Sequence, residues 1–381
     1  GVSFTPGDER ISMCIRALHR RVVVALAVVL VTLSLAGRAA AHVRYVTPGG
    51  DPLAVAEFLR TALTNPFNIA LLAAGGVGGV AVAAVYLRLR PFQRDLAVFR
   101  DTMAGYRDLL PWLLRLSVGL PLVGAGFAGY YFSPAVTLGS PTFVRLFGIA
   151  VGFLLLFGFG TRLVAFVGLV GYLAGLAFEP TLLLAFEYAP AFAAIALLGG
   201  GRPSADHVVS RLADADTVYS RIDPFYRAVA VPFVERVDPY RALVPVIVRI
   251  GLGISFVYLG ITQKLMNPGN ATAVVAKYNL TAVVPVSPEL WVVGAGLTEA
   301  AVGTLLILGA FTRGASAVAF LLFTTTLFGL PDDPVLAHIS LFGLASALLV
   351  TGAGRWSVDA WLRDRTESAA EWVDRVSERA A

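Results

Sequence analysis

The chain has 381 residues, of which 57% are hydrophobic and 14% are charged. A soluble domain carries about a quarter charged residues and has no means of burying this much apolar surface. The composition therefore excludes a soluble globular enzyme and a disordered protein, and it predicts a multi-pass membrane protein in a lipid bilayer. The net charge of +5 is small for this length and fits arginines at membrane edges, so nucleic acid is not an expected partner.

The N-terminal segment has the pattern of a cleavable signal peptide. A basic stretch at 13–21 precedes an apolar run at 22–35, and Ala39-Ala40-Ala41 supplies the small residues of a cleavage site. The alternative is an uncleaved anchor helix. Cys14 is the sole cysteine and precedes this site, so the mature chain would have no thiol for disulfide exchange, iron–sulfur ligation or nucleophilic catalysis. We expect no metal site.

Nine apolar stretches after the signal peptide predict membrane spans. They lie at 68–87, 111–131, 143–160, 163–178, 181–198, 242–263, 290–311, 315–330 and 335–351. Arginines concentrate in the 88–110 and 199–241 segments, and two glycosylation sequons, at Asn270 and Asn279, fall in the 264–289 loop. Because positive charges favour the inside and glycosylation occurs outside, we expect an outer mature N-terminus and a cytoplasmic C-terminus in a cell membrane.

Two parts of the chain resemble each other. Residues 115–134 (RLSVGLPLVGAGFAGYYFSP) align without gaps on 249–268 (RIGLGISFVYLGITQKLMNP), 152–162 on 303–313, and 202–206 on 355–359. Each copy holds four spans, so both have the same orientation in the membrane. The predicted fold class is an all-α polytopic membrane protein with a cleavable signal peptide, one extra span and two parallel four-helix repeats.

This pattern predicts six segments. A leader and signal peptide (1–41) is followed by an outer arm, first span and inner loop (42–110), and then by the first repeat (111–201). An inner amphipathic linker (202–241) joins it to the second repeat (242–355), and an inner amphipathic tail (356–381) ends the chain. Within the extra span, Gly75-Gly76-Val77-Gly78-Gly79 predicts close packing against another helix.

The two copies differ at three polar positions. Lys264 aligns with Tyr130, Glu299 with Gly148, and His338 with Glu187. Ionisable groups within spans are costly and are functional hypotheses by default. We therefore interpret the first copy as a scaffold half and the second as the working half.

The second copy resembles the DoxX family of integral membrane proteins. The matching residues are Arg249 and Gly253, Gly260 and Lys264, Glu299 and Gly303, Leu308-Gly309 and Thr312-Arg313. The first copy matches the same pattern in degenerate form, so the resemblance implies a tandem duplicated DoxX-type four-helix domain. Members similar to the DoxD type are linked to quinone-coupled sulfur oxidation, and others to membrane oxidoreductase complexes. The resemblance therefore implies a quinone, held non-covalently, and a redox partner subunit.

Three residues are the candidates for the working site: Glu299, His338 and Lys264. Glu299 suits proton or quinol handling or substrate binding, or serves as a structural carboxylate bonded to a neighbouring helix. Lys264 extends toward the outer surface, pairs with Glu299 or contacts an anionic substrate headgroup. His338 suits a quinone carbonyl or a proton, or is a packing histidine. Arg162 and Arg313 in the inner turns are expected to cap helix C-termini.

The predicted function is that of a DoxX-like membrane subunit accessory to a quinone-linked oxidoreductase that oxidises sulfur or another small substrate. Two alternatives stay open. The parallel repeat and the buried carboxylate also fit a transporter for a small solute or anion. The inner amphipathic segments also fit a non-catalytic membrane scaffold that recruits partners.

Overall fold

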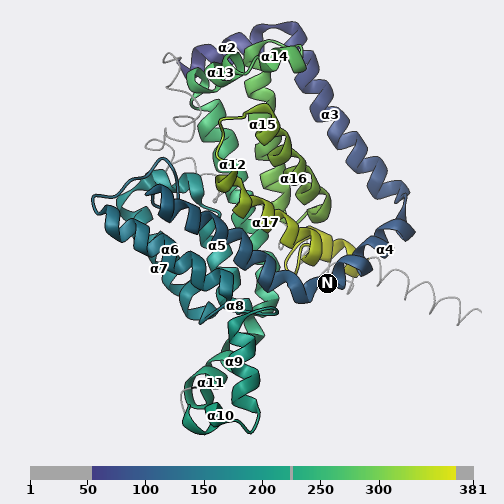
Figure 1. The fold of residues 1–381 in the computed structure, drawn as a ribbon. Helices are drawn as coiled ribbons and strands as arrows, with labels where there is room; N and C mark the ends of the chain where they lie inside the picture. Colours follow the sequence, from purple (N-terminus) through teal and green to yellow (C-terminus); the bar gives the residue numbers. More distant parts are fainter. Residues whose placement is uncertain (1–53, 224–225, 366–381) are drawn as a thin grey trace, which may run out of the picture.

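The computed structural model describes residues 54–223 and 226–365, and within these ranges every regular element is helical. The expected signal peptide (1–41) and most of the tail (366–381) lie outside the described residues. Figure 1 shows two groups of helices side by side, with one long helix standing apart from them. The fold class is thus that of an all-α polytopic membrane protein.

The chain is first described as an arm of three helices: α2 (Val55–Thr64), α3 (Pro66–Leu89) and α4 (Gln93–Ala104). Asn65 begins α3, because its side chain accepts a hydrogen bond from the backbone N–H of Phe67. At the other end, Arg90 adopts a left-handed conformation and stops the helix. With 24 mostly apolar residues, α3 is long enough to cross a bilayer.

The first four-helix unit follows the arm. Its elements are η3 (Arg107–Leu109), α5 (Leu110–Ala128), α6 (Pro141–Phe157), α7 (Thr161–Phe178), η4 (Pro180–Ala185) and α8 (Tyr188–Leu198). The prediction of one continuous span at 181–198 is wrong. The 11 residues of α8 reach only about 16 Å at 1.5 Å per residue. The preceding turn is a 3₁₀ helix, in which Leu182 O accepts a hydrogen bond from the hydroxyl of Tyr172.

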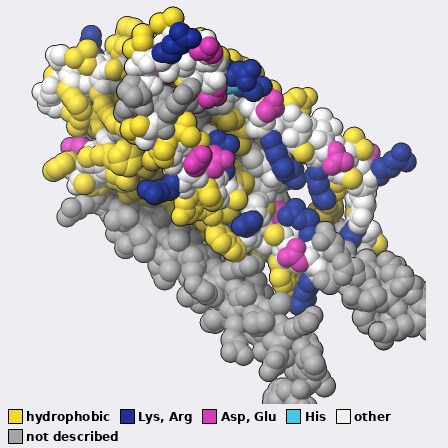
Figure 2. Space-filling view, turned by 90° about the horizontal axis from the view of Figure 1, so that it is seen from below, with side chains coloured by type: hydrophobic (Ala, Val, Ile, Leu, Met, Phe, Trp, Pro, Cys, Tyr) yellow, Lys and Arg dark blue, Asp and Glu magenta, His cyan; other side chains and the backbone are white. Residues whose placement is uncertain are grey.

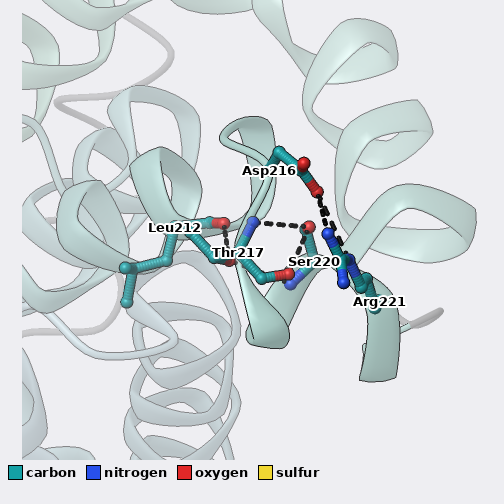
Figure 3. Close-up of polar contacts among 5 residues, drawn as sticks. All are labelled: Leu212, Asp216, Thr217, Ser220 and Arg221. Carbon is teal, nitrogen blue, oxygen red and sulfur yellow. Dashed lines mark hydrogen bonds and ion pairs between the residues drawn. The ribbon is translucent and has the colours of Figure 1, made fainter.

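A small helical projection separates the two units. It contains α9 (Ala205–Asp214), α10 (Val218–Ile222), the π-helix η5 (Tyr226–Ala230), α11 (Val231–Val237) and the 3₁₀ helix η6 (Asp238–Leu243). Figure 1 shows α9, α10 and α11 extending away from the end of the bundle. A capping box starts α10: Thr217 Oγ1 accepts from the N–H of Ser220, and Ser220 Oγ accepts from the N–H of Thr217 (Figure 3).

The second unit contains α12 (Val244–Tyr258), the π-helix η7 (Leu259–Leu265), α13 (Pro268–Lys277), α14 (Leu280–Val283), α15 (Pro288–Leu308), α16 (Thr312–Gly329) and α17 (Val335–Thr351). The short helices α13 and α14 occupy the 264–289 loop. Apolar side chains of α2, α13, α14 and α15 form a separate small core there: Phe58, Ala62, Ala271, Val275, Leu280, Val292 and Val293. This core fastens the start of α3 to the second unit (Figure 1).

The two units meet along a seam made by their first and last helices. Helix α5 packs against α17, and α8 packs against α12. Small residues permit both approaches, because a β-carbon at Gly343 would clash with Ser117 and one at Gly251 would clash with Pro190. The largest buried apolar cluster runs through this seam and includes Leu114, Leu252 and Leu344, all fully buried.

Within the described residues, five helical stretches are long and apolar enough to cross a membrane: Pro66–Leu89, Arg107–Ala128, Thr161–Phe178, Ala228–Leu265 and Pro288–Leu308. Three shorter apolar helices accompany them: Pro141–Phe157, Tyr188–Leu198 and Val335–Thr351. These helices fit a multi-pass membrane protein.

The packing predicted for the glycines of α3 is wrong. Among the described residues, no atom outside the nearby backbone of α3 itself lies within 4 Å of a β-carbon built at Gly75, Gly76, Gly78 or Gly79, and none of the apolar window of α3 is buried. The helix stands off from both units between its two attached ends.

Candidate functional site

Lys264 lies on the π-helix η7, which continues α12 toward the 264–289 loop. The wider turn is seen in the hydrogen bond from the N–H of Met266 to Ile261 O, five residues back. The turn leaves carbonyl groups without helical partners, and Asn267 Nδ2 donates to one of them, Thr262 O, at 2.6 Å. A π-helix frequently marks a functional site, and here it places the lysine.

Two glycines bring η7 against α15. A β-carbon at Gly260 would lie 2.6 Å from Gly296 O, and one at Gly296 would lie 2.9 Å from Gly260 O. The Cβ of Glu299 also lies beside Gly260, at 3.0 Å from that built β-carbon. Only glycines allow this approach, and it places the carboxylate of α15 beside the lysine of η7.

Lys264 and Glu299 form an ion pair. Lys264 Nζ lies 2.7 Å from both Oε1 and Oε2 of Glu299. The side chains of Lys264 and Glu299 are 27% and 20% exposed. The pair is therefore largely surrounded by apolar helices while one edge stays open. Of the three alternatives for Lys264, the structure shows the contact with Glu299.

His338 lies near the start of α17 and is 6% exposed. Its Nδ1 lies 3.2 Å from Pro334 O, and its Nε2 lies 3.5 Å from Asp333 Oδ2. Because a carbonyl oxygen only accepts, Nδ1 carries a hydrogen in this contact. The Nε2 atom then faces a carboxylate oxygen, an arrangement that is favourable only when a further proton lies between the ring and Asp333.

Asp333 links this histidine to the charges of the ion pair. It is 6% exposed, and its Oδ1 is buried without a hydrogen-bond partner. Burial raises the pKa of its carboxyl, and the charges of His338 and Lys264 oppose that shift. The three predicted site residues thus fall into two contacts, Lys264 with Glu299 and His338 with Asp333, within electrostatic reach of each other.

Sequence reasoning did not place Glu187 among the site residues. It lies between η4 and α8, is 3% exposed, and accepts a hydrogen bond from Ser340 Oγ at 3.2 Å. Together with His338 it lines a cavity of about 20 Å³ at the seam, whose wall also includes Ser133. A carboxylate inside an apolar span was the sequence signal for this site.

The contacts across the seam fit a different alignment of Glu187 from the predicted one with His338. A shift of 134 takes Ser117 of α5 to Gly251, and a shift of 153 takes Pro190 of α8 to Gly343. These four residues form two contacts, Ser117 with Gly343 and Gly251 with Pro190. The shift of 153 aligns Glu187 with Ser340, and these two side chains contact each other.

A second ion pair fastens the 264–289 loop to the turn before α17. Lys277 Nζ and the hydroxyl of Tyr278 donate to Asp332 Oδ2 at 2.7 Å and 2.8 Å. The hydrogen bond from Lys277 holds the pKa of the Asp332 carboxyl below its ordinary value, and the same bond raises the pKa of Lys277. The side chains of Lys277 and Asp332 are 40% and 57% exposed. This pair therefore lies closer to the surface than the Lys264–Glu299 pair.

The opposite end of the bundle is built on arginines. Arg162 Nη1 donates to Ala196 O and Leu197 O at the end of α8. Arg313 donates to Leu349 O and Val350 O at the end of α17. The expectation that these arginines cap helix C-termini is confirmed.

Other contacts at this end recur in the two units. The N–H groups of Gly160 and Thr161 donate to Asp206, and those of Phe311 and Thr312 donate to Asp359. The buried Arg115 donates to Pro203 O. The buried Arg249 donates to carbonyl oxygens at the end of α15 and beyond α17, among them Ala353 O and Trp356 O.

Figure 2 shows Lys and Arg side chains gathered on this face of the molecule. Arg100, Arg107 and Arg363 are exposed there and act electrostatically on Arg313. Among residues 54–223 and 226–365, no group of three or more His, Cys, Asp or Glu side chains has the arrangement of a metal site.

Comparison with known proteins bears on the second unit. Residues 244–339 match the family model described as DoxX. This segment runs from the start of α12 into α17 and contains Lys264, Glu299 and His338, so it supports the DoxX resemblance for the part of the chain that holds the candidate site. No curated protein and no solved structure matches the chain.

Proposed function

We propose that this chain is a DoxX-type membrane subunit that binds a quinone for a partner oxidoreductase. The observation that carries the proposal is the Lys264–Glu299 ion pair, which lies among apolar helices and keeps one edge open. Charged groups are costly in this setting and persist where they serve a ligand or a proton. The proposal assigns the second unit the working role and the first unit a supporting one.

The residues present fit a quinone headgroup. Such a ring offers two carbonyl oxygens as acceptors and an apolar face. Lys264 has three N–H donors, and two oxygens of Glu299 engage its ammonium, which leaves a third donor for a carbonyl oxygen. The apolar side chains of Leu265 and Met266 adjoin the lysine, and Met266 is 40% exposed.

Each member of the pair has a separate task in this proposal. Glu299 keeps Lys264 charged and oriented, and Lys264 donates a hydrogen bond to the ligand. Glu299 also accepts a proton when one is released beside it. A quinone supplies reversible electron and proton uptake when it is bound, and electrons are exchanged with the partner subunit.

The repeated contacts of the two units support a duplicated architecture. Asp206 corresponds to Asp359, since each accepts from backbone N–H groups at the start of a helix. Arg162 corresponds to Arg313, since each donates to carbonyl oxygens at the end of the unit's last helix. We infer that two parallel four-helix units arose from one ancestor. Their arginine-rich end is the cytoplasmic one in this proposal, because positive charge favours the inside.

Bound quinone tests the proposal directly. The full chain is reconstituted in lipid nanodiscs with the quinone pool of its membrane and washed, and the retained quinone is then quantified. We expect stoichiometric quinone in the wild type and a large loss in Glu299→Gln and Lys264→Gln. Lys277→Gln is the matched control, since it breaks the exposed lysine pair at the same end. Absence of quinone from the wild type, or equal retention by all variants, refutes the proposal.

A scaffold role is the second candidate, and the projection formed by α9, α10 and α11 favours it. Val218 and Ile222 on α10 are 71% and 72% exposed, and Phe233 on α11 is 52% exposed. Apolar side chains on short helices at the arginine-rich end suit docking on a partner or on lipid. Deletion of 210–236 with a short Gly-Ser bridge, which keeps Asp206 and its contacts, removes partner binding in the scaffold role and leaves quinone retention intact in the quinone role.

A further inference from the structure

The seam between the two four-helix units holds a pair of buried ionisable side chains apart from the Lys264–Glu299 pair. Glu187 from the first unit and His338 from the second line one cavity of about 20 Å³ and are 3% and 6% exposed. A cavity of this size accommodates about one water molecule when polar groups line it. The polar wall is completed by Ser133, which is 3% exposed.

The surroundings of Glu187 favour a neutral carboxyl. Ser340 Oγ donates to its Oε1, and none of the ion pairs formed by the described residues includes Glu187. Apart from His338 across the cavity, the neighbouring ionisable groups are Tyr188 and Tyr172 on α7, which supply no positive charge. An isolated carboxylate is costly in such surroundings, so a proton on Glu187 relieves the cost.

A chain of polar atoms leads from this cavity toward the end of the bundle that carries the 264–289 loop. His338 Nδ1 donates to Pro334 O, and its Nε2 faces Asp333 Oδ2 at 3.5 Å. Asp333 Oδ1 is buried with no hydrogen-bond partner. The next residue toward the surface, Asp332, has a side chain that is 57% exposed.

We propose that the seam is a proton-binding site, in which Glu187 and His338 exchange a proton through water in their shared cavity and Asp333 connects it to the end bearing the 264–289 loop. The proton comes from bulk water at that end. Asp333 takes up this proton and passes it to Nε2 of His338, where an N–H bond forms as the O–H bond at Asp333 breaks. The N–H bond at Nδ1 of His338 then breaks, and its proton passes through the water to form an O–H bond at Glu187; the reverse transfers return it. The site stands apart from the proposed quinone contact at Lys264.

The two units make this arrangement possible only together. Glu187 is held by the first unit, while His338, Ser340 and Asp333 belong to the second. The proton site therefore depends on how the two units pack at the seam. Any relative movement of the units changes the distance between Glu187 and His338. Asp333 also responds to the charge of Lys264, which couples the proton site to the ion pair.

Infrared difference spectroscopy of the full chain in nanodiscs tests the proposal. We expect the wild type to show a carboxylic acid C=O band that titrates with pH and shifts in D₂O, and Glu187→Gln to lose it. Glu179→Gln is the matched control, because Glu179 is an exposed carboxylate in the same unit, and it is expected to keep the band. A wild type without such a band, or a band that survives in Glu187→Gln, overturns the proposal.

The path is tested separately from the site. Asp333→Asn is expected to slow deuterium exchange of the Glu187 band by roughly 100-fold, the lower range for loss of a positioned proton-transfer group. Unchanged exchange in Asp333→Asn refutes the route through this residue. Where Glu187→Gln does not fold, Ser340→Ala keeps the carboxyl and removes its donor, so it is expected to move the band and its titration midpoint. An unmoved band in Ser340→Ala refutes the assignment to Glu187.

Discussion

The half-buried Lys264–Glu299 pair leads to the most quantitative prediction, a double-mutant cycle with Lys264→Met and Glu299→Gln. Nζ lies 2.7 Å from both carboxylate oxygens, and the two side chains are 27% and 20% exposed. Removing one member of a fully buried pair costs about 3–5 kcal/mol. Water at the open edge relieves part of this cost, so each single substitution is expected to lower the free energy of unfolding by about 2–3 kcal/mol.

The coupling energy is the part of this loss that belongs to the contact itself. Interhelical hydrogen bonds in membranes average about 0.6 kcal/mol and reach about 1.7 kcal/mol, because the reference state also finds partners. The Lys264–Glu299 contact is charged and bidentate, which places its expected coupling near the upper limit, at about 1.5 kcal/mol. The double variant is therefore expected to be less destabilised than the sum of its singles.

Equilibrium unfolding in mixed detergent micelles, followed by circular dichroism, measures all four corners of the cycle. The same cycle on Lys277→Met and Asp332→Asn is the control. That pair has the same 2.7 Å distance with 40% and 57% exposed side chains, so its coupling is expected to be close to zero. Equal coupling in the two cycles means that burial does not strengthen the Lys264–Glu299 contact, and the reasoning fails.

Three further predictions follow from other parts of the fold. Gly343→Ala is expected to destabilise the seam by about 1–3 kcal/mol through overpacking. Gly314→Ala, in open space on α16, is expected to stabilise the protein by up to about 1 kcal/mol. Thermal unfolding measures both variants, and shifts of the melting temperature in the same direction for Gly343→Ala and Gly314→Ala contradict this. Asn279 is exposed in a left-handed turn, whereas Asn270 is half-buried and has a partner, so in a glycosylating host the mass of the chain should fall in Asn279→Gln and stay unchanged in Asn270→Gln. The lowered pKa of Asp332 means that its contribution to stability is complete above pH 3.8 and disappears as pH falls through the folded-state pKa. Hydrogen exchange in α13, corrected for intrinsic rates, should rise in acid, and Asp332→Asn should reproduce that rise at neutral pH; equal protection in the two proteins at neutral pH would contradict it.

The helical architecture and the ends of its helices followed from sequence because they depend on local features. Apolar stretches gave the positions of the main helices, and the Thr-Arg turns gave the arginine caps at Arg162 and Arg313. The contact of Lys264 with Glu299 was one of three alternatives. Sequence alone did not decide among them, because the approach depends on Gly260 and Gly296 facing each other across two helices.

The errors arose where tertiary contacts override a local pattern. The glycines of α3 have the spacing of a packing motif, yet the attachments at the two ends of this helix hold it away from the units. The stretch at 181–198 is apolar enough to predict one span, but its first part forms a 3₁₀ turn whose carbonyl group is bonded by Tyr172. Glu187 was undervalued because its meaning depends on the seam partner Ser340.

The comparison of the two units separates architecture from chemistry. Contacts that hold helix ends recur in both, as with Asp206 and Asp359 at equivalent turns, so they are requirements of the four-helix unit itself. The Lys264–Glu299 pair occurs in the second unit, where the first has Tyr130 and Gly148 at the aligned positions. In the proposed duplication, a feature that one copy lacks is not needed to form the shared scaffold. The ion pair is therefore better explained by a ligand or a proton than by folding, which is the reason for placing the quinone contact there.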